Sequence, residues 1–384
     1  MISPETFCGE LLRGGVSYFV GVPDSLLKNL GSHFASSLTP DEHTIAANEG
    51  TAVAMAIGHH LRTGELAAVY LQNSGIGNAV NPLLSLADPE VYGIPMLLIV
   101  GWRGEPGVKD EPQHVKQGRV MKALLEAIEV PYTVLPRDQE DALTSVRDAL
   151  ERAVSRQGPV VVLVEKDTFD RPRRGVTVTP LASNLPTREA ALKRVIDTLG
   201  TDAIVVSTTG MLSRELYEYR VANATEPSDF LTVGGMGHAS SIALGVALRE
   251  PTRQVWCLDG DGALLMHAGA LTNVASQAPP TYHHVVFNNG VHDSVGGQPT
   301  AICNVDLPAL SLAAGYRGAL RVNEIDAIPS AVAKMRENGG PTLIEILVKP
   351  GARSDLGRPT TTPAENKTAF MENVRSHARA LNAD

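Results

Sequence analysis

Short apolar runs alternate with amphipathic stretches along almost the whole chain. The runs are rich in β-branched residues, which predicts strands, and the segments between them carry apolar residues at helical spacing. The predicted strands are Val16–Val20, Ala67–Leu71, Met96–Val100, Tyr132–Leu135, Val160–Glu165, Ala203–Ser207, Val255–Leu258, His283–Phe287 and Thr342–Val348. Because these strands are almost continuously apolar, we expect parallel sheets that are covered by helices on both faces.

The segments between the strands predict the covering helices. They comprise a helix that opens at Pro23-Asp24-Ser25, the helix Glu49–Thr63 that stops at Gly64, the helix Ala142–Val154, one from Met211, one that ends at Leu248, and Ala327–Arg336. A Gly-rich turn, Gly234–Gly237, precedes the helix that ends at Leu248. The regular alternation of strand and helix is typical of doubly wound α/β domains.

The alternation breaks between residues 171 and 187, where Pro and Arg replace the periodic pattern, so we interpret this stretch as a linker. On either side a helix is followed by a Gly-Pro pair and a strand, at Gly158-Pro159 and again at Gly340-Pro341. We therefore predict an α/β protein of two doubly wound parallel-sheet domains of similar topology, 1–170 and 188–384, with no middle domain.

Composition narrows the class of protein. The 384 residues suit two domains, and 33 Lys and Arg against 42 Asp and Glu leave a net charge of −9, which argues against nucleic-acid binding. Cys8, Cys257 and Cys303 are too few and too scattered for a disulfide framework, so we expect a cytoplasmic protein. The apolar runs are too short to cross a membrane, and the first residues contain no signal-type apolar core.

Two polar motifs follow consecutive strands of the second half. Gly260-Asp261-Gly262 comes directly after one strand, and Asn288-Asn289 comes after the next, with 25 residues between the two motifs. Carboxyl ends of parallel strands are the usual ligand position, and glycines let backbone N–H groups approach a diphosphate. The carboxylate of Asp261 and the amide oxygen of Asn289 are hard ligands that suit Mg²⁺. The alternative is two unrelated turns.

Glu49 and Met236 are unusual for their surroundings. Glu49 opens a long helix among small apolar residues such as Ala47 and Ala52, so its carboxyl group is expected to be desolvated, with a raised pKa. The alternative is that Glu49 only complements the helix dipole. Met236 lies in the turn Gly234–Gly237, 25 residues before Asp261, where it projects from a tight loop or merely fills a gap.

Together these motifs resemble the thiamine diphosphate-dependent enzymes. The resemblance implies that Asp261, Asn289 and the backbone carbonyl of Val291 hold Mg²⁺, and that the cofactor is also contacted by Gly234, Gly260, Gly262 and Ala263. It further implies that Glu49 activates the pyrimidine ring of the cofactor and that Met236 holds the cofactor bent. Since that family brings the two halves together across a subunit interface, we expect a homo-oligomer, a dimer at least.

Within this family the chain is similar to the phosphonopyruvate decarboxylases. The residues that carry the likeness are Gly21-Val22-Pro23-Asp24-Ser25, the stretch from Gln72 to Pro82, Gly101-Trp102-Arg103-Gly104-Glu105-Pro106-Gly107, and Asp355-Leu356-Gly357-Arg358-Pro359-Thr360. The resemblance implies decarboxylation of 3-phosphonopyruvate to phosphonoacetaldehyde and CO2. Alternatives are a sulfopyruvate decarboxylase, another 2-oxo acid decarboxylase or carboligase, and a non-catalytic homologue. The intact Glu49, Asp261 and Asn289 argue against the last alternative.

Further acid–base groups are expected near the substrate. Asp24 lies in the loop after the first strand, where it is either catalytic or a helix N-cap. His114 resembles a position at which related decarboxylases carry a catalytic histidine, and His292, close to the Asn-Asn pair, is a further candidate. Structural roles are the alternative for both histidines.

A phosphonate dianion requires cationic or hydroxyl partners. The candidates are Ser25, Arg353, Arg358 and Lys367, and Arg103, Lys109 and Lys116 also lie in loop contexts. The tail from Lys349 to Lys367 is rich in Gly, Pro and Thr, so it is either a lid over the site or a solvated tail.

Overall fold

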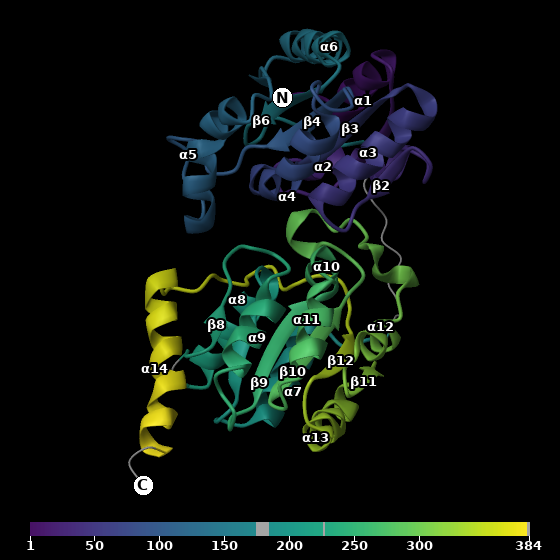
Figure 1. The fold of residues 1–384 in the computed structure, drawn as a ribbon. Coiled ribbons are helices and arrows are strands. Elements are labelled where there is room, and N and C mark those ends of the chain that lie inside the picture. Colours follow the sequence, from purple (N-terminus) through teal and green to yellow (C-terminus); the bar gives the residue numbers. More distant parts are fainter. Residues whose placement is uncertain (174–183, 226, 382–384) are drawn as a thin grey trace. The chain divides into compact units, whose positions relative to one another are not determined.

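The computed structural model describes residues 1–173, 184–225 and 227–381. The chain divides into two compact units, Met1–Val178 with Ser294–Pro299, and Thr179–Asp293 with Thr300–Asp384. Each unit contains one six-stranded sheet with helices around it, as Figure 1 shows. Most of the predicted linker 171–187 lies outside the described residues, so the domain boundaries stay a prediction.

The first unit follows the predicted alternation of strand and helix. Its strands are β1 (Val16–Gly21), β2 (His43–Ile45), β3 (Leu66–Gln72), β4 (Met96–Gly101), β5 (Tyr132–Val134) and β6 (Pro159–Val164). Its helices are α1 (Pro4–Arg13), α2 (Lys28–Ser37), α3 (Glu49–Thr63), η1 (Asn73–Gly75), α4 (Ile76–Pro82), η2 (Leu83–Ala87), α5 (Pro112–Ala127) and α6 (Gln139–Arg156). All strand pairs are parallel, in the order β2-β1-β3-β4-β6-β5.

The second unit is built in the same way. Its strands are β7 (Ile204–Ser207), β8 (Phe230–Leu231), β9 (Val255–Gly260), β10 (Tyr282–Asn288), β11 (Gly318–Val322) and β12 (Thr342–Leu347). Its α-helices are α7 (Arg188–Leu199), α8 (Met211–Ala222), α9 (Ala239–Ala247), α10 (Asp261–Met266), α11 (Ala270–Gln277), α12 (Leu307–Ala314), α13 (Ile328–Asn338) and α14 (Pro363–Leu381). The short helices η3 (Asp293–Val295), η4 (Ala301–Asn304) and η5 (Ile325–Ala327) complete the element order.

The two sheets have the same topology. Listed from its edge strand β8, the second sheet runs β8-β7-β9-β10-β12-β11, again with parallel strands throughout. Since β7 is the first strand of its unit, this order corresponds strand by strand to β2-β1-β3-β4-β6-β5 of the first sheet. The pairs Gly158-Pro159 and Gly340-Pro341 stand before equivalent strands, β6 and β12. The predicted fold class is therefore confirmed, and no third sheet is present among the described residues.

Both faces of each sheet are covered, as the apolar strands predict. In the first unit alternate strand residues such as Phe19 and Val20 enter two separate cores, one against α1, α2 and α6 and the other against α3, α4 and α5. In the second unit one core lies against α7, α8 and α13, and the other against α9, α11, α12 and α14. Ligand-binding side chains are therefore expected mainly at the strand ends, where the loops leave the sheet.

Some boundaries differ from the sequence prediction. The helix expected at Pro23 begins at Lys28 instead, because Asp24 Oδ2 accepts the backbone N–H groups of Leu26 (2.9 Å) and Leu27 (3.2 Å) and holds a turn there. The helix Glu49–Thr63 is confirmed, with a left-handed Gly64 at its end. The short strands β2 and β8 and the edge strand β11 were not predicted, since a few residues give no clear alternation.

The C-terminal tail is not loosely solvated. Arg214 Nε on α8 donates to the carbonyl of Gly357 at 2.6 Å, and Tyr217 Oη lies 2.6 Å from Thr360 Oγ1. The tail then enters α14 at Pro363, and Phe370 on that helix packs against Phe230 of β8 with ring centroids 5.4 Å apart. Within its own unit the tail is thus fixed along α8 and β8. Among the described residues no helix has the length and apolar character that a membrane span requires.

Candidate functional site

Polar residues gather at the carboxyl end of the first sheet. Asp24 follows β1, Glu49 follows β2, Asn73 follows β3 and Arg103 follows β4. These four strands are neighbours in the sheet, and β1, between β2 and β3, is where the strand order reverses. Such a switch point is the usual position of a ligand in an open α/β sheet.

Glu49 is the first residue of α3 and its side chain is buried. Asn48 caps the helix by accepting the N–H of Thr51 at 2.9 Å, which leaves the Glu49 carboxyl group to turn inward. Asn78 Nδ2 of α4 donates to Glu49 Oε2 at 2.7 Å. Burial raises the pKa of Glu49, and the bond from Asn78 opposes this only in part. The carboxyl group is therefore able to hold a proton at higher pH than an exposed one.

Two glycines allow α3 and α4 to approach this closely. A Cβ atom on Gly75 would lie 2.3 Å from Glu49 Oε1, and a Cβ atom on Gly50 would lie 2.8 Å from the carbonyl oxygen of Asn78. No residue larger than glycine therefore fits at either position. The Gly75–Asn78 stretch was part of the sequence resemblance, and its contact with Glu49 gives it a physical role.

Asp24 is buried beside β4 with one oxygen unused. Its Oδ2 binds the turn that delays α2, while no hydrogen-bond partner of Oδ1 is found among the described residues. A Cβ atom on Gly101 would lie 2.1 Å from Asp24 Oδ2, so the glycine makes room for the carboxyl group. Burial raises the pKa of Asp24 to about 6, and the charge of Arg103 and the backbone N–H bonds oppose that rise. The N-cap alternative is wrong, because the N-cap of α2 is Leu27 and has no side-chain cap, and Asp24 binds the N–H groups of the turn before the helix.

Arg103 is held from three sides. Its Nε donates to Asp110 Oδ2 at 2.7 Å, its Nη2 pairs with Asp110 Oδ1, and its Nη1 donates to Ser25 Oγ at 2.7 Å. Asn73 fixes the backbone of Arg103 by bonds in both directions, at 2.9 and 3.1 Å. The side chain is only 17% exposed.

His114 lies on the first turns of α5, beside this arginine. Its carbonyl oxygen would be 1.9 Å from a Cβ atom on Gly104, so the loop after β4 packs directly on α5. Burial and the charge of Arg103 lower the pKa of His114 to about 4, although Asp110 opposes the shift. His114 is therefore neutral at pH 7, and its Nδ1 has no partner among the described residues.

In the second unit Asp261 opens α10 directly after β9. It is 2% exposed, and Thr300 Oγ1 donates to its Oδ2 at 2.5 Å. Burial raises the pKa of Asp261 to about 6, and the bonds from Thr300 and from backbone N–H groups, Asn289 and Gly262 among them, oppose the rise. Thr300 was not predicted, because its position in a loop after β10 carries no sequence signal.

Asn289 is oriented by an ion-pair network. Its Nδ2 donates to Asp293 Oδ2 at 2.7 Å, and the same oxygen accepts Arg188 Nη1 at 2.7 Å. Arg188 is also paired through two bonds of 3.0 Å with Glu215. The network fixes the orientation of the Asn289 amide, because its NH2 group is bound to Asp293. Among the described residues its Oδ1 accepts only the N–H of Val291, at 3.1 Å.

Gly260 and Gly262, on either side of Asp261, differ in the space around them. A Cβ atom on Gly262 would lie 2.9 Å from His292 Cε1 and 3.1 Å from Thr300 Cγ2, whereas one on Gly260 would meet nothing within 4 Å. Gly262 is therefore required by packing inside the protein, and Gly260 leaves open space. Burial lowers the pKa of His292 to about 4 and Asp293 opposes the shift, so this ring packs on the loop as a neutral group.

The turn that carries Met236 packs against the start of α10. Gly235 and Gly237 have φ angles of 65° and 88°, which only glycine adopts readily. A Cβ atom on Gly237 would lie 2.9 Å from the carbonyl oxygen of Ala263. Gly234 and Met236 are half-buried. The turn follows β8, the strand equivalent to β2, so Met236 and Glu49 stand at the same topological place in their own sheets.

The donor set of the second unit fits a hard divalent cation with a diphosphate. Asp261 and Asn289 supply a carboxylate and an amide oxygen from the ends of two adjacent strands, β9 and β10, and the backbone of Val291 follows closely. A buried carboxyl group with a raised pKa is stabilised as an anion by such a cation. Mg²⁺ at this place remains a prediction.

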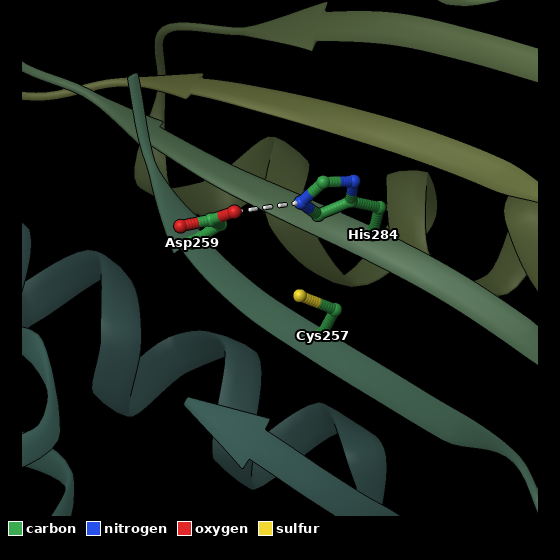
Figure 2. A group of neighbouring side chains, drawn as sticks. All are labelled: Cys257, Asp259 and His284. Atoms are coloured by element: carbon green, nitrogen blue, oxygen red, sulfur yellow. Dashed lines mark hydrogen bonds and ion pairs between the residues drawn. The ribbon is translucent and has the colours of Figure 1, made fainter. Parts of the chain in front are cut away.

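A second group of potential ligands lies deeper in the same sheet. Figure 2 shows Cys257 and Asp259 on β9 beside His284 on β10. All three side chains are buried, His284 Nε2 lies 3.4 Å from Asp259 Oδ2, and Asp259 Oδ1 accepts the N–H of Gly260 at 2.9 Å. This group supports the strand end from which Asp261 projects.

The predicted phosphonate-binding cations differ in their exposure and in their ion pairs. Arg353 is surrounded by three carboxylates, Glu189 at 3.2 Å, Asp355 at 3.2 Å and Glu218 in direct contact. Such neutralisation disfavours Arg353 as an anion-binding group. Arg358 and Lys367 are exposed, as are Lys109 and Lys116. Ser25 is the partner of Arg103 described above.

Family models match both units. Residues 5–125 match the N-terminal thiamine pyrophosphate binding domain of thiamine pyrophosphate enzymes, and residues 208–346 match the C-terminal one. The chain is also 40% identical to the phosphonopyruvate decarboxylase of Streptomyces hygroscopicus, over 97% of this chain and 94% of the relative. The chain therefore belongs to the thiamine pyrophosphate-dependent decarboxylase family, and the resemblance found in the sequence is confirmed.

Two further relatives help to place the chain within the family. The phosphonopyruvate decarboxylase of Streptomyces viridochromogenes is 39% identical over 96% of this chain and 94% of the relative. The sulfopyruvate decarboxylase of Methanosarcina acetivorans is 26% identical over 97% of this chain and 98% of the relative. Both relatives span nearly the same length as this chain, and the phosphonopyruvate decarboxylase is the more similar of the two.

Proposed function

We propose that this protein decarboxylates 3-phosphonopyruvate to phosphonoacetaldehyde and CO2, with thiamine diphosphate and Mg²⁺. The observation that carries the proposal is the identity of 40% over 97% of the chain with a phosphonopyruvate decarboxylase, against 26% with a sulfopyruvate decarboxylase. The buried acids at the strand ends of both units support it, because a thiamine enzyme needs a protonated carboxyl group and a cation site.

The cofactor would be held by residues of both sheets. Bound thiamine diphosphate supplies the electron sink that lets CO2 leave a 2-oxo acid. In the proposal Asp261, Asn289 and the carbonyl of Val291 hold Mg²⁺ and the diphosphate, with Gly260, Gly262, Ala263 and Gly234 lining the cofactor and Met236 supporting it. Glu49 keeps a proton on its buried carboxyl group for the ring nitrogen of the cofactor, and the bond from Asn78 orients that group.

Asp24 and His114 serve the substrate side in this proposal. With a pKa of about 6, Asp24 exchanges a proton close to neutral pH, which suits a group that returns a proton to the product. His114, neutral at pH 7, offers one ring N–H and one acceptor, and orients the substrate rather than carrying charge. His292 is assigned to packing against Gly262.

The assembly and the location belong to the same proposal. Glu49 and Asp261 lie in different units of the chain, and the resemblance to thiamine diphosphate-dependent enzymes implies that such groups meet across a subunit interface. We therefore infer a homo-oligomer, at least a dimer, in which each site takes one unit from each subunit. The protein is proposed to be cytoplasmic, which its three unpaired cysteines favour.

A substrate panel tests the proposal. With thiamine diphosphate and Mg²⁺ present, CO2 and aldehyde formation are measured for phosphonopyruvate, sulfopyruvate and pyruvate. We expect the highest kcat/KM for phosphonopyruvate and no turnover when either cofactor is removed. Faster turnover of sulfopyruvate would assign the chain to the alternative decarboxylase, and acetolactate formed from pyruvate would indicate a carboligase.

Glu49→Gln tests the role of the buried acid. Glutamine keeps the size and the contact with Asn78 but carries no exchangeable acid proton, so kcat should fall at least about 100-fold while thiamine diphosphate still binds. Steady-state kinetics and quenching of tryptophan fluorescence by the cofactor separate the two effects. Glu151→Gln, an exposed change on α6, is the matched control. Unchanged turnover in Glu49→Gln would remove Glu49 from the mechanism.

A further inference from the structure

The first unit contains a second buried polar cluster beside Glu49. Asp24, Ser25, Arg103, Asp110 and His114 come from the ends of β1 and β4 and from the start of α5. Two of its buried polar atoms, Asp24 Oδ1 and His114 Nδ1, have no hydrogen-bond partner among the described residues. Unpaired polar atoms are costly inside a protein, so the cluster is built to receive a polar ligand.

Arg103 is the cation of this cluster and still has donors to offer. A guanidinium group carries five N–H donors. Within the described part of the chain, Asp110 takes one from Nε and one from Nη2, and Ser25 takes one from Nη1. Among the described residues one N–H on Nη1 and one on Nη2 therefore remain for a ligand, and a guanidinium group is well suited to binding the oxygens of an anion.

Asp110 fixes the arginine rather than only cancelling its charge. The two-point contact locks the guanidinium plane, and the N–H of Gly104 also donates to Asp110 Oδ2 at 2.9 Å. A preorganised fork loses less side-chain entropy when an anion binds than a mobile lysine does.

The cluster is tied to the Glu49 carboxyl group through a short chain of contacts. Asn73 bonds to the backbone of Arg103 in both directions and begins η1. Gly75, at the other end of η1, abuts the Glu49 carboxyl group. Contacts within the first unit therefore connect Arg103 with the Glu49 carboxyl group, to which the proposed function assigns activation of the cofactor. Lys109 and Lys116 are exposed and lack such support.

We infer that Arg103, together with the Ser25 hydroxyl group, binds the C3 phosphonate of the substrate and determines the preference for an anionic 2-oxo acid. The inference rests on the proposed function, which it deepens. It moves the phosphonate site from the C-terminal cations Arg353, Arg358 and Lys367 to the strand ends of the first unit.

The test compares two substrates in the loaded oligomeric enzyme. Arg103→Met keeps the length of the side chain and removes the charge, so kcat/KM for phosphonopyruvate should fall about 100-fold more than kcat/KM for pyruvate, mainly through KM. Ser25→Ala should lower the same ratio about 5-fold, by loss of one hydrogen bond. Arg119→Met, an exposed change on α5, is the matched control and should leave the ratio unchanged.

Two further measurements keep the result unambiguous. Arg103→Met leaves Asp110 unpaired, so the double variant with Asp110→Asn is measured as well, and both are checked for fold by circular dichroism. Binding of 3-phosphonopropanoate, which lacks the reactive keto group, is measured by calorimetry. The wild type should bind it and the two Arg103 variants should bind at least about 30-fold more weakly.

The outcomes separate the inference from the proposed function. Equal losses for both substrates in folded Arg103 variants, or unchanged binding of 3-phosphonopropanoate, overturn the inference. A wild-type enzyme that does not turn over phosphonopyruvate overturns the proposed function. In that case loss of 3-phosphonopropanoate binding in the variants would still establish Arg103 as the anion-binding residue.

Discussion

Three carboxyl groups of this protein, those of Asp24, Glu49 and Asp261, are almost completely removed from water. For each of them burial raises the pKa, and the hydrogen bonds from neighbouring N–H or O–H groups oppose the rise. Keeping such groups costs folding free energy, because the anion is less stable inside the protein than in the unfolded chain. At the residue scale, burial of these three carboxyl groups therefore lowers the free energy of unfolding but gives them the raised pKa values that the proposed chemistry uses.

The pH dependence of Asp24 follows from this cost. The folded group, with its pKa raised from 3.8 to about 6, binds a proton more tightly than the unfolded group. Stability therefore falls as the pH rises between these values. Asp24→Asn removes this loss, so the variant should gain up to about 3 kcal/mol relative to the wild type above pH 6, and little below pH 4.

Denaturant unfolding of both proteins between pH 4 and pH 8 measures this difference. Asp148→Asn, an exposed change on α6, should show no pH-dependent gain. A difference between Asp24→Asn and the wild type that does not vary with pH would contradict the assignment of a raised pKa to Asp24.

At the scale of elements, the site depends on how closely helices and loops approach one another. The contact of α3 with the η1–α4 segment is possible because Gly75 has no side chain where Glu49 lies. The loop after β10 is held by polar contacts instead, because Asn289 is hydrogen-bonded to Asp293, which is paired with Arg188. A site built on such contacts responds to changes that touch no reacting atom.

Gly75→Ala should displace Glu49. The new methyl group would fall 2.3 Å from Glu49 Oε1, so the carboxyl group must move away, and kcat should drop at least about 10-fold. Gly77→Ala is the matched control, since a Cβ atom on Gly77 meets nothing within 4 Å, and alanine there should stabilise α4 by about 0.5 to 1 kcal/mol. Steady-state kinetics and thermal unfolding check both variants. Full activity in Gly75→Ala would contradict this geometry.

Asp293→Ala should weaken the cation site. Without Asp293 the Asn289 amide loses the acceptor for its NH2 group and is free to turn, so the Mg²⁺ concentration for half-maximal activity should rise about 10-fold or more. Asp293→Asn, which keeps an acceptor oxygen, should recover part of that affinity. Titration with Mg²⁺ at saturating thiamine diphosphate measures the effect, and Asp326→Ala, an exposed change, serves as control. Identical titrations for all variants would exclude a positioning role for Asp293.

At the scale of the whole molecule, two units of one topology carry complementary groups. The first holds Glu49 after its second strand and the other holds Asp261 after its third, so in the proposed site each unit supplies part of the set. The net charge of −9 makes a shielded cation such as Arg103 more important, because an anionic substrate needs a local positive site on an acidic protein.

Complementation tests whether each site takes one unit from each subunit. Glu49→Gln and Asp261→Ala are each expected to be inactive alone. When both chains are produced in one cell with different tags and the mixed dimer is isolated, one of its two sites is intact, so about half of the wild-type activity should return. The control is each variant purified with both tags. An inactive mixed dimer would show that each site uses both units of a single chain.

The sequence by itself determined the fold class, the family and the positions of nine of the twelve strands that the structure describes. Continuous β-branched runs are visible along the chain because burial on both faces demands them, and Gly260-Asp261-Gly262 with Asn288-Asn289 is visible because cation and diphosphate chemistry demands particular residues at particular strand ends. Glu49 was singled out for the same reason: a carboxylate among small apolar neighbours is conspicuous without any structure.

The tertiary structure decided which polar groups meet. Ser25 with Arg103, Thr300 with Asp261, and Asn78 with Glu49 are pairs formed between separate segments, and the local pattern of neither partner indicates the other. It also placed the candidate Arg353 among three carboxylates, and Arg103, which the sequence named only as a further cation in a loop, on Asp110 and Ser25. The physical reason is that charge, desolvation and hydrogen bonding depend on distances in space, whereas a sequence pattern reports only the periodicity of the backbone.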